Sequence, residues 1–145
     1  PAQEQVSEAR SGEKSISGRY FLCAEDNELN AEILRELLDM EGARADIAVN
    51  GKEAVEKFAA APAGTYDAVL MDVQMPVMDG YEATRAIRAL DHPRAASVPI
   101  VAMTANAFAS DVQAAMEAGM NAHLAKPVDM KKLVEVLVQL WKDIA

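Results

Sequence analysis

The chain has 145 residues, a length that fits one ordinary domain with a single substantial core. Apolar residues make up 51% and charged residues 26%, which excludes a disordered or fibrous protein, and no apolar run approaches the roughly 20 residues that cross a bilayer. The net charge of -9 argues against a nucleic-acid partner, because surfaces that bind phosphate backbones are normally basic.

The chain begins with a polar segment and then becomes periodic. Residues 1–17 lack a sustained apolar period and are predicted to form a linker or disordered tail, with the domain at residues 18–145. Beyond the tail, short apolar runs alternate with longer amphipathic stretches, which is typical of βα units around a parallel sheet. The predicted strands are residues 20–24, 43–49, 68–71, 100–103 and 122–125. Most of them are continuously apolar, so we expect helices on both sheet faces.

Five helices are predicted between and after these strands. They are one that ends at Gly42, one from Asn50 to before Pro62, one at about residues 80–89, one that ends at Gly119 and one that begins near Asp129. The apolar spacing places Ile33 on the buried face of the first helix and Met116 on that of the fourth.

The compartment is indicated by the termini and the cysteine content. The N-terminus lacks the apolar segment of a signal peptide. Cys23 is the only cysteine, so an internal disulfide is excluded, and its apolar neighbours predict that it is a core residue. We therefore expect a soluble, cytoplasmic domain without membrane contact of its own. The parent protein can still be anchored to a membrane by another segment. The first residue, Pro1, suggests a piece or processed product of a longer protein.

Polar side chains follow four of the five predicted strands. Glu25 and Asp26 come after the first strand, Asp72 after the third, Thr104 after the fourth and Lys126 after the fifth. In an open parallel sheet, ligands bind beyond the carboxyl ends of the strands. We therefore expect these five side chains to converge on one surface.

Three carboxylates in one place need a counter-charge. A pair of like charges about 4 Å apart repels by roughly 4 kcal/mol at an effective dielectric constant of about 20. Mg²⁺ suits such oxygen ligands and leaves room for phosphate oxygens, so we expect it on Asp26 and Asp72, with Glu25 partly through water. Asp72 is then the nucleophile that forms an acyl phosphate, while Lys126 and Thr104 contact the phosphoryl oxygens.

These residues lie in segments that resemble the receiver domains of two-component response regulators (CheY-like domains). The segments are AEDNELN, LMDVQMPVMDGYEATRAIR, VAMTANAF and HLAKPVD, and the resemblance covers about residues 19–142. It implies an α/β, flavodoxin-like (βα)5 fold, a doubly wound parallel sheet of order 2-1-3-4-5. It also implies phosphorylation of Asp72 from a phosphohistidine on a histidine kinase dimerisation domain or a histidine phosphotransfer domain. The Lys126-Pro127 bond is often cis in this family.

The resemblance implies further roles for individual residues. The backbone carbonyl of Gln74 would contact the metal. Gln74 and Asn106, two residues beyond Asp72 and Thr104, occupy positions that tune phosphate lifetime. Signalling passes through Thr104 and through the position of His123, where the family often has Tyr or Phe. Two roles are left open for His123: a packed strand residue or an element of the switch.

The amino-acid sequences of the motifs most resemble those of receiver domains in hybrid sensor histidine kinases. A free-standing single-domain response regulator is the alternative, and no DNA-binding segment follows Ala145, which fits both. A Mg²⁺-dependent aspartyl-phosphate phosphatase is less favoured, because such an enzyme would carry Asp-x-Asp where Asp72 is followed by Gln74. A flavodoxin-like cofactor binder is disfavoured because EDNELNA lacks a Gly and Ser/Thr phosphate loop. The intact set of five polar residues disfavours a receiver-like domain that binds partners without phosphorylation.

The remaining candidates are assigned structural roles. Asp79-Gly80 is predicted to form a turn and a helix start. Met71, Met75 and Met78 have no neighbouring histidine or cysteine and are predicted to pack rather than bind a soft metal. His92, in the sequence LDHPRAA, is expected to be a solvated loop residue.

Overall fold

A five-stranded parallel sheet forms the centre of the domain. The computed structural model describes residues 15–105 and 109–144. The strands are β1 (Tyr20–Ala24), β2 (Arg44–Ala48), β3 (Ala68–Asp72), β4 (Ile100–Thr104) and β5 (Ala122–Ala125). Their order is β2-β1-β3-β4-β5, with every neighbouring pair parallel, so the predicted doubly wound order is confirmed.

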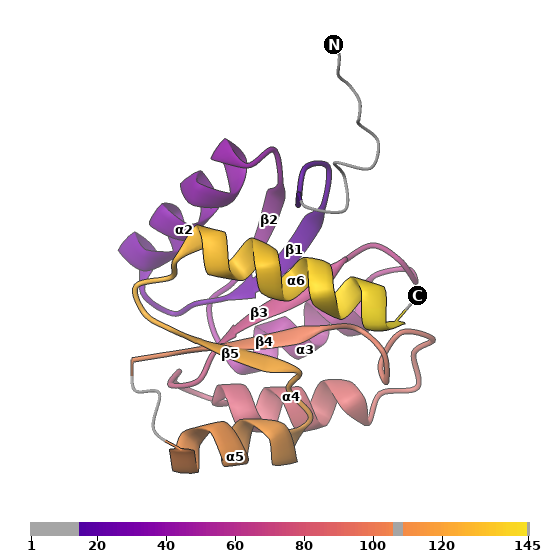
Figure 1. Cartoon of the computed structure of the whole chain (residues 1–145). Coiled ribbons are helices and arrows are strands. Elements are labelled where there is room, and N and C mark those ends of the chain that lie inside the picture. Colours follow the sequence, from indigo (N-terminus) through magenta and orange to yellow (C-terminus); the bar gives the residue numbers. More distant parts are fainter. Residues whose placement is uncertain (1–14, 106–108, 145) are drawn as a thin grey trace.

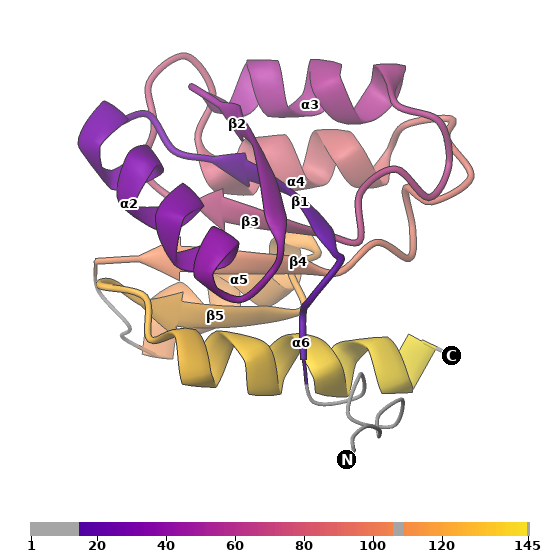
Figure 2. The same cartoon turned by 90° about the horizontal axis from the view of Figure 1, so that it is seen from above.

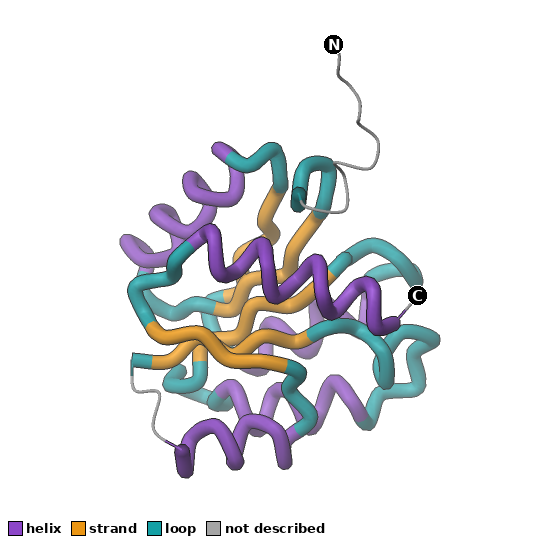
Figure 3. The backbone as a smooth tube through the Cα atoms, viewed as in Figure 1, coloured by secondary structure: helices purple, strands orange, loops and turns teal. Residues whose placement is uncertain are grey.

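Each strand is followed by a helix that crosses back over the sheet (Figure 1). The helices are α2 (Glu28–Met40), α3 (Gly51–Ala60), α4 (Gly80–Arg88), α5 (Ala109–Ala118) and α6 (Met130–Ile144). The alternation of strand, loop and helix along the chain is visible in Figure 3. None of the helices in the described part of the chain is both long and apolar enough to cross a membrane.

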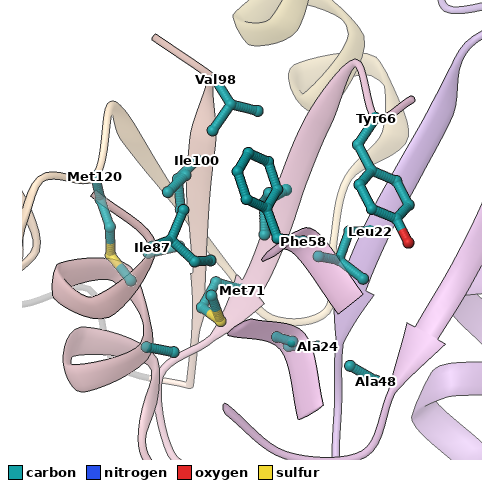
Figure 4. Packing of buried hydrophobic residues seen from close by; sticks show 14 of the residues in the cluster. Leu22, Ala24, Ala48, Phe58, Tyr66, Met71, Ile87, Val98, Ile100 and Met120 are labelled. Atoms are coloured by element: carbon teal, nitrogen blue, oxygen red, sulfur yellow. The ribbon is translucent and has the colours of Figure 1, made fainter. Parts of the chain in front are cut away.

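The helices form two layers, one on each face of the sheet (Figure 2). Alternate residues of a strand point to opposite faces, so Leu22 packs against the layer of α3, α4 and α5, whereas Phe21 and Cys23 pack against α2 and α6. The first of these two cores, with Phe58 of α3 and Ile87 of α4 beside the sheet, is drawn in Figure 4. Cys23 is fully buried, as predicted from its apolar neighbours.

Three of the five strands differ from the predicted bounds, by one residue at one or both ends. β1 and β5 have the predicted bounds, and β2 is one residue shorter at each end. β3 and β4 are each one residue longer, because Asp72 pairs with Met103 and Thr104 pairs with Ala125. Asp72 and Thr104 are thus the last residues of their strands rather than the first residues of the loops.

Three side chains lie elsewhere than predicted. Ile33 is 47% exposed and Met116 is 55% exposed, because the buried stripe of α2 is centred on Leu34 and that of α5 on Ala115. His92 is partly buried rather than a fully solvated loop residue. Its Nε2 lies 2.8 Å from the carbonyl oxygen of Ala61, and its ring centroid lies 4.7 Å from that of Phe58.

The start of the domain also differs from the predicted linker. Ile16 lies within residues 1–17, yet its side chain is fully buried in the core between the sheet and the layer of α2 and α6. At the other end of the chain, the Lys126-Pro127 peptide bond is cis, as the resemblance implies.

Candidate functional site

Three carboxylates meet at the carboxyl edge of the sheet. Glu25 directly follows β1, Asp26 comes next, and Asp72 ends the neighbouring strand β3. One oxygen from each carboxylate lies within 4.8 Å of the others. Glu25 and Asp72 are buried, with 3% and 5% of their surface exposed, whereas Asp26 is exposed. The cluster is therefore closed toward the core and open toward solvent.

Lys126 places one positive charge against this cluster. It directly follows β5, and its backbone N–H donates to the carbonyl oxygen of Thr104 at 2.8 Å. Its Nζ lies 2.8 Å from Oε1 of Glu25 and 3.1 Å from Oδ2 of Asp72. Burial lowers the pKa of Lys126, but its hydrogen bonds to Glu25 and Asp72 and their charges outweigh burial and raise it. The side chain is thus held as a cation between the two buried acids.

The Asp72 carboxyl group is costly to ionise in this setting. Burial raises the pKa of Asp72 to about 6, and the charge of Glu25 acts in the same direction. The hydrogen bond from Lys126 opposes both effects without cancelling them. One ammonium group facing three acids leaves an excess of negative charge, so the site favours a further cation.

The donor set fits a hard divalent cation. All three side chains offer carboxylate oxygens, the atoms that Mg²⁺ prefers, and no histidine or cysteine belongs to the cluster among the described residues. Because Asp26 lies on the open side, the ion could keep several waters and still face an incoming oxygen ligand. The residues present therefore fit Mg²⁺.

Two glycines hold the loop after Asp72, because backbone carbonyl oxygens pack directly against their Cα atoms. A Cβ on Gly80 would lie 2.3 Å from the carbonyl oxygen of Asp72, and the Gly80 N–H donates to the carbonyl oxygen of Val73 at 2.8 Å. A Cβ on Gly51 would lie 2.3 Å from the carbonyl oxygen of Met78, which accepts from the Gly51 N–H at 3.1 Å. Only glycine leaves room for these contacts. The Gly80 contacts fix the start of α4 against the end of β3, and the Gly51 contact fixes the far part of the loop against the start of α3.

The same loop contains a capped helix start and a strained residue. Asp79 and Glu82 form a reciprocal capping box at the start of α4, as the Asp79-Gly80 motif predicts. Val77 has a φ of 70°, a value that β-branched residues rarely adopt, and its side chain is 75% exposed. The loop therefore presents an apolar residue to solvent five positions beyond Asp72.

Three of the other predicted site residues lie in the described part of the chain, in or after β3, β4 and β5. Thr104 ends β4 and is partly buried. His123 is a partly buried residue of β5, paired with Ala102. Gln74 is exposed two residues beyond Asp72, and Asn106 lies outside the described residues. The roles expected of these four residues remain predictions.

An apolar groove beside the cluster has no motif in the sequence that points to it. It has a volume of about 320 Å³ and lies between α2 and the start of the segment that follows β5. We call it the α2 groove. Its lining is Glu25, Asn30, Ile33, Leu34, Leu37, Met103, Lys126, Pro127 and Val128. Ile33 lines this groove, which is why it is exposed although its spacing predicts the buried face.

Comparison with known proteins agrees with this geometry. The family profile described as the response regulator receiver domain matches residues 21–138. Hybrid signal transduction histidine kinase I of Dictyostelium discoideum is 37% identical over 142 residues, which cover 92% of this chain. The chain spans only 8% of the length of that kinase.

Two solved receiver domains have the same fold. The receiver domain of sensor histidine kinase PA1611 from Pseudomonas aeruginosa PAO1, solved with a magnesium ion coordinated in its active site cleft, is 39% identical, with a TM-score of 0.75. The match covers 86% of this chain and 98% of that one. The receiver domain of Ssk1 from Saccharomyces cerevisiae, co-crystallised with the histidine phosphotransfer signalling protein Ypd1, is 29% identical, with a TM-score of 0.73 and coverage of 88% and 92%. Because the profile matches most of the chain and the fold agrees, this chain belongs to the response regulator receiver domain family.

Proposed function

We propose that Asp72 accepts a phosphoryl group from a phosphohistidine. We further propose that the domain is the receiver domain of a hybrid histidine kinase and lies in the cytoplasm. The observation that carries this proposal is the position of the buried Asp72 carboxylate. It lies 3.1 Å from the Lys126 ammonium group, within a three-carboxylate cluster that is open on one side. Family membership and the similarity to a much longer hybrid kinase support it.

The transfer would proceed by displacement at phosphorus. An oxygen of Asp72 forms the new O–P bond as the N–P bond to the donor imidazole breaks, and the electron pair stays on the imidazole nitrogen, which takes up a proton from water. In this proposal Lys126 donates a hydrogen bond to a phosphoryl oxygen, and Thr104, at the end of β4, donates from its hydroxyl group; the short distance from Lys126 to Asp72 supports the role of the lysine.

The cation would be held by Glu25, Asp26, Asp72 and the backbone carbonyl of Gln74. Bound there, Mg²⁺ supplies positive charge that offsets the negative charge of the phosphoryl oxygens and of the carboxylates. The solved PA1611 receiver with its coordinated magnesium ion supports this assignment. Gln74, Asn106 and His123 are proposed to set the phosphate lifetime and the response to phosphorylation.

The phosphodonor is proposed to be a histidine phosphotransfer domain or a histidine kinase dimerisation domain that docks over the α2 groove. Leu29 and Ile33 on α2 are 69% and 47% exposed, and Val77 in the loop that follows β3 is 75% exposed. Exposed apolar side chains next to a polar site are typical of protein interfaces. The Ssk1 receiver in complex with Ypd1 supports a partner of this class.

The assignment of Asp72 is tested by labelling with acetyl phosphate in the presence of Mg²⁺, followed by intact-mass measurement. We expect the wild-type chain to gain one phosphoryl group, and Asp72→Asn to gain none. Asp91→Asn, at an exposed loop position, makes the same change of charge and should label like the wild type. Equal labelling of Asp72→Asn and wild type would overturn the proposal.

A further inference from the structure

Residues 15–19, the lead-in segment before β1, are packed as part of the domain, although the sequence pattern predicts a linker for most of this segment. The side chain of Ile16 is fully buried in the same cluster as Leu38 of α2 and Leu137 of α6. The Gly18 N–H donates to the carbonyl oxygen of Gly42 at 2.8 Å, in the turn between α2 and β2. The chain is thus held at two points before the first strand begins.

Arg19 attaches this segment to the end of α6. Its guanidinium carbon lies 4.1 Å from the ring centroid of Trp141, and its Nη1 lies 3.2 Å from Oδ1 of Asp67. The Trp141 indole N–H donates to the backbone carbonyl oxygen of Asp67 at 3.0 Å, and the Tyr20 N–H donates to Oδ2 of the same residue at 2.9 Å. Asp67 therefore joins the lead-in segment, the start of β3 and α6 in one network.

The turn at Gly42 is shaped for the same segment. Gly42 has a φ of 82°, and a Cβ there would lie 2.7 Å from Oγ of Ser17. The Arg44 N–H donates to the carbonyl oxygen of Arg19 at 2.9 Å, which continues the β1–β2 ladder outward to the lead-in segment. A larger residue at Gly42 would displace Ser17 or strain the turn.

We propose that residues 15–19 form a lead-in clip, which attaches the chain that precedes the sheet to α6 and gives it a fixed direction. The clip lies at the amino edge of the sheet, because Arg19 precedes β1 and Asp67 precedes β3, whereas Glu25 and Asp72 lie at the carboxyl edge. In Figure 2 the segment that leads into β1 passes α6. The chain before residue 15 is therefore attached at the edge of the sheet opposite the acidic cluster, and a displacement of α6 would be transmitted to residues 15–19 through Trp141. This inference does not depend on phosphorylation.

The clip is tested in the 145-residue chain with Ile16→Ala and Arg19→Ala. We expect Ile16→Ala to lower Tm by roughly 5–15 °C, the range for truncation of a fully buried isoleucine. Trp141 is the only tryptophan, so its emission reports on the contact with Arg19 directly, and Arg19→Ala should shift that emission. Arg44→Ala is the matched control, because this exposed arginine lies 4.6 Å from the ring of Tyr20 and should leave Trp141 unchanged.

Hydrogen exchange separates a clip from a general loss of stability. In the wild type, the Gly18 amide and the Trp141 indole N–H should both be protected at 25 °C. In Arg19→Ala, which leaves the core intact, both should exchange faster while amides of β4 keep their protection. An unprotected Gly18 amide in the wild type, or unchanged exchange of the Trp141 indole in Arg19→Ala, would overturn the proposal, as would an Ile16→Ala variant with an unchanged Tm.

Discussion

Replacement of Asp72 by asparagine is expected to stabilise the metal-free domain at pH 8. Burial raises the pKa of Asp72 from 3.8 to about 6, so the folded state binds this proton more tightly than the unfolded state. The stability that comes from the protonated group is complete below pH 3.8 and is lost as the pH rises through 6. A difference of about 2 between the two pKa values corresponds to roughly 3 kcal/mol of lost stability at pH 8. Asparagine keeps the shape of the side chain but cannot ionise.

Thermal unfolding in EDTA, followed by circular dichroism, measures this effect. At pH 8 the Tm of Asp72→Asn should exceed that of the wild type by roughly 5–10 °C, and the gap should narrow as the pH falls to 4. Millimolar Mg²⁺ should then raise the Tm of the wild type more than that of the variant, because the ion binds the folded carboxylate cluster. The exposed Asp91→Asn controls for net charge and should shift Tm little. A metal-free Asp72→Asn less stable than the wild type at pH 8 would refute the reasoning.

Two further predictions concern the surroundings of Asp72. Leu29→Ser should slow phosphotransfer from a phosphorylated histidine phosphotransfer domain about fivefold or more, because a truncated apolar contact weakens docking, while labelling by acetyl phosphate stays unchanged. Met40→Ser, 80% exposed at the other end of α2, is the control, and equal transfer rates for both variants would contradict the docking surface. Gly80→Ala should lower the free energy of unfolding by about 1–3 kcal/mol in urea titrations, because the new methyl group would meet the Asp72 carbonyl oxygen at 2.3 Å. Gly64→Ala has no atom within 4 Å of its new Cβ and bears only the strain of a positive φ, so a loss as large as that of Gly80→Ala would argue against the clash.

The sequence alone determines the elements and the edge on which the polar residues gather. Strand and helix positions follow from local periodicity, which depends on neighbours within a few residues, and the observed strands differ from the predicted ones by at most one residue at either end. Residues that end parallel strands share one edge of the sheet, so Glu25, Asp72 and Lys126 can be expected to converge before any coordinates exist. The strand order itself came from the family resemblance, since periodicity does not determine which strands are neighbours.

Only the tertiary structure decides which apolar side chains are buried and where one backbone segment packs closely against another. Ile33 and Ile16 are chemically alike, yet one lines an open groove and the other is fully buried, because only Ile16 is enclosed by segments distant in the sequence. Gly51 and Gly80 look like ordinary turn glycines until the backbone oxygens of Met78 and Asp72 are found against them. Burial and close approach depend on contacts between residues far apart in the chain, which a local sequence pattern does not contain.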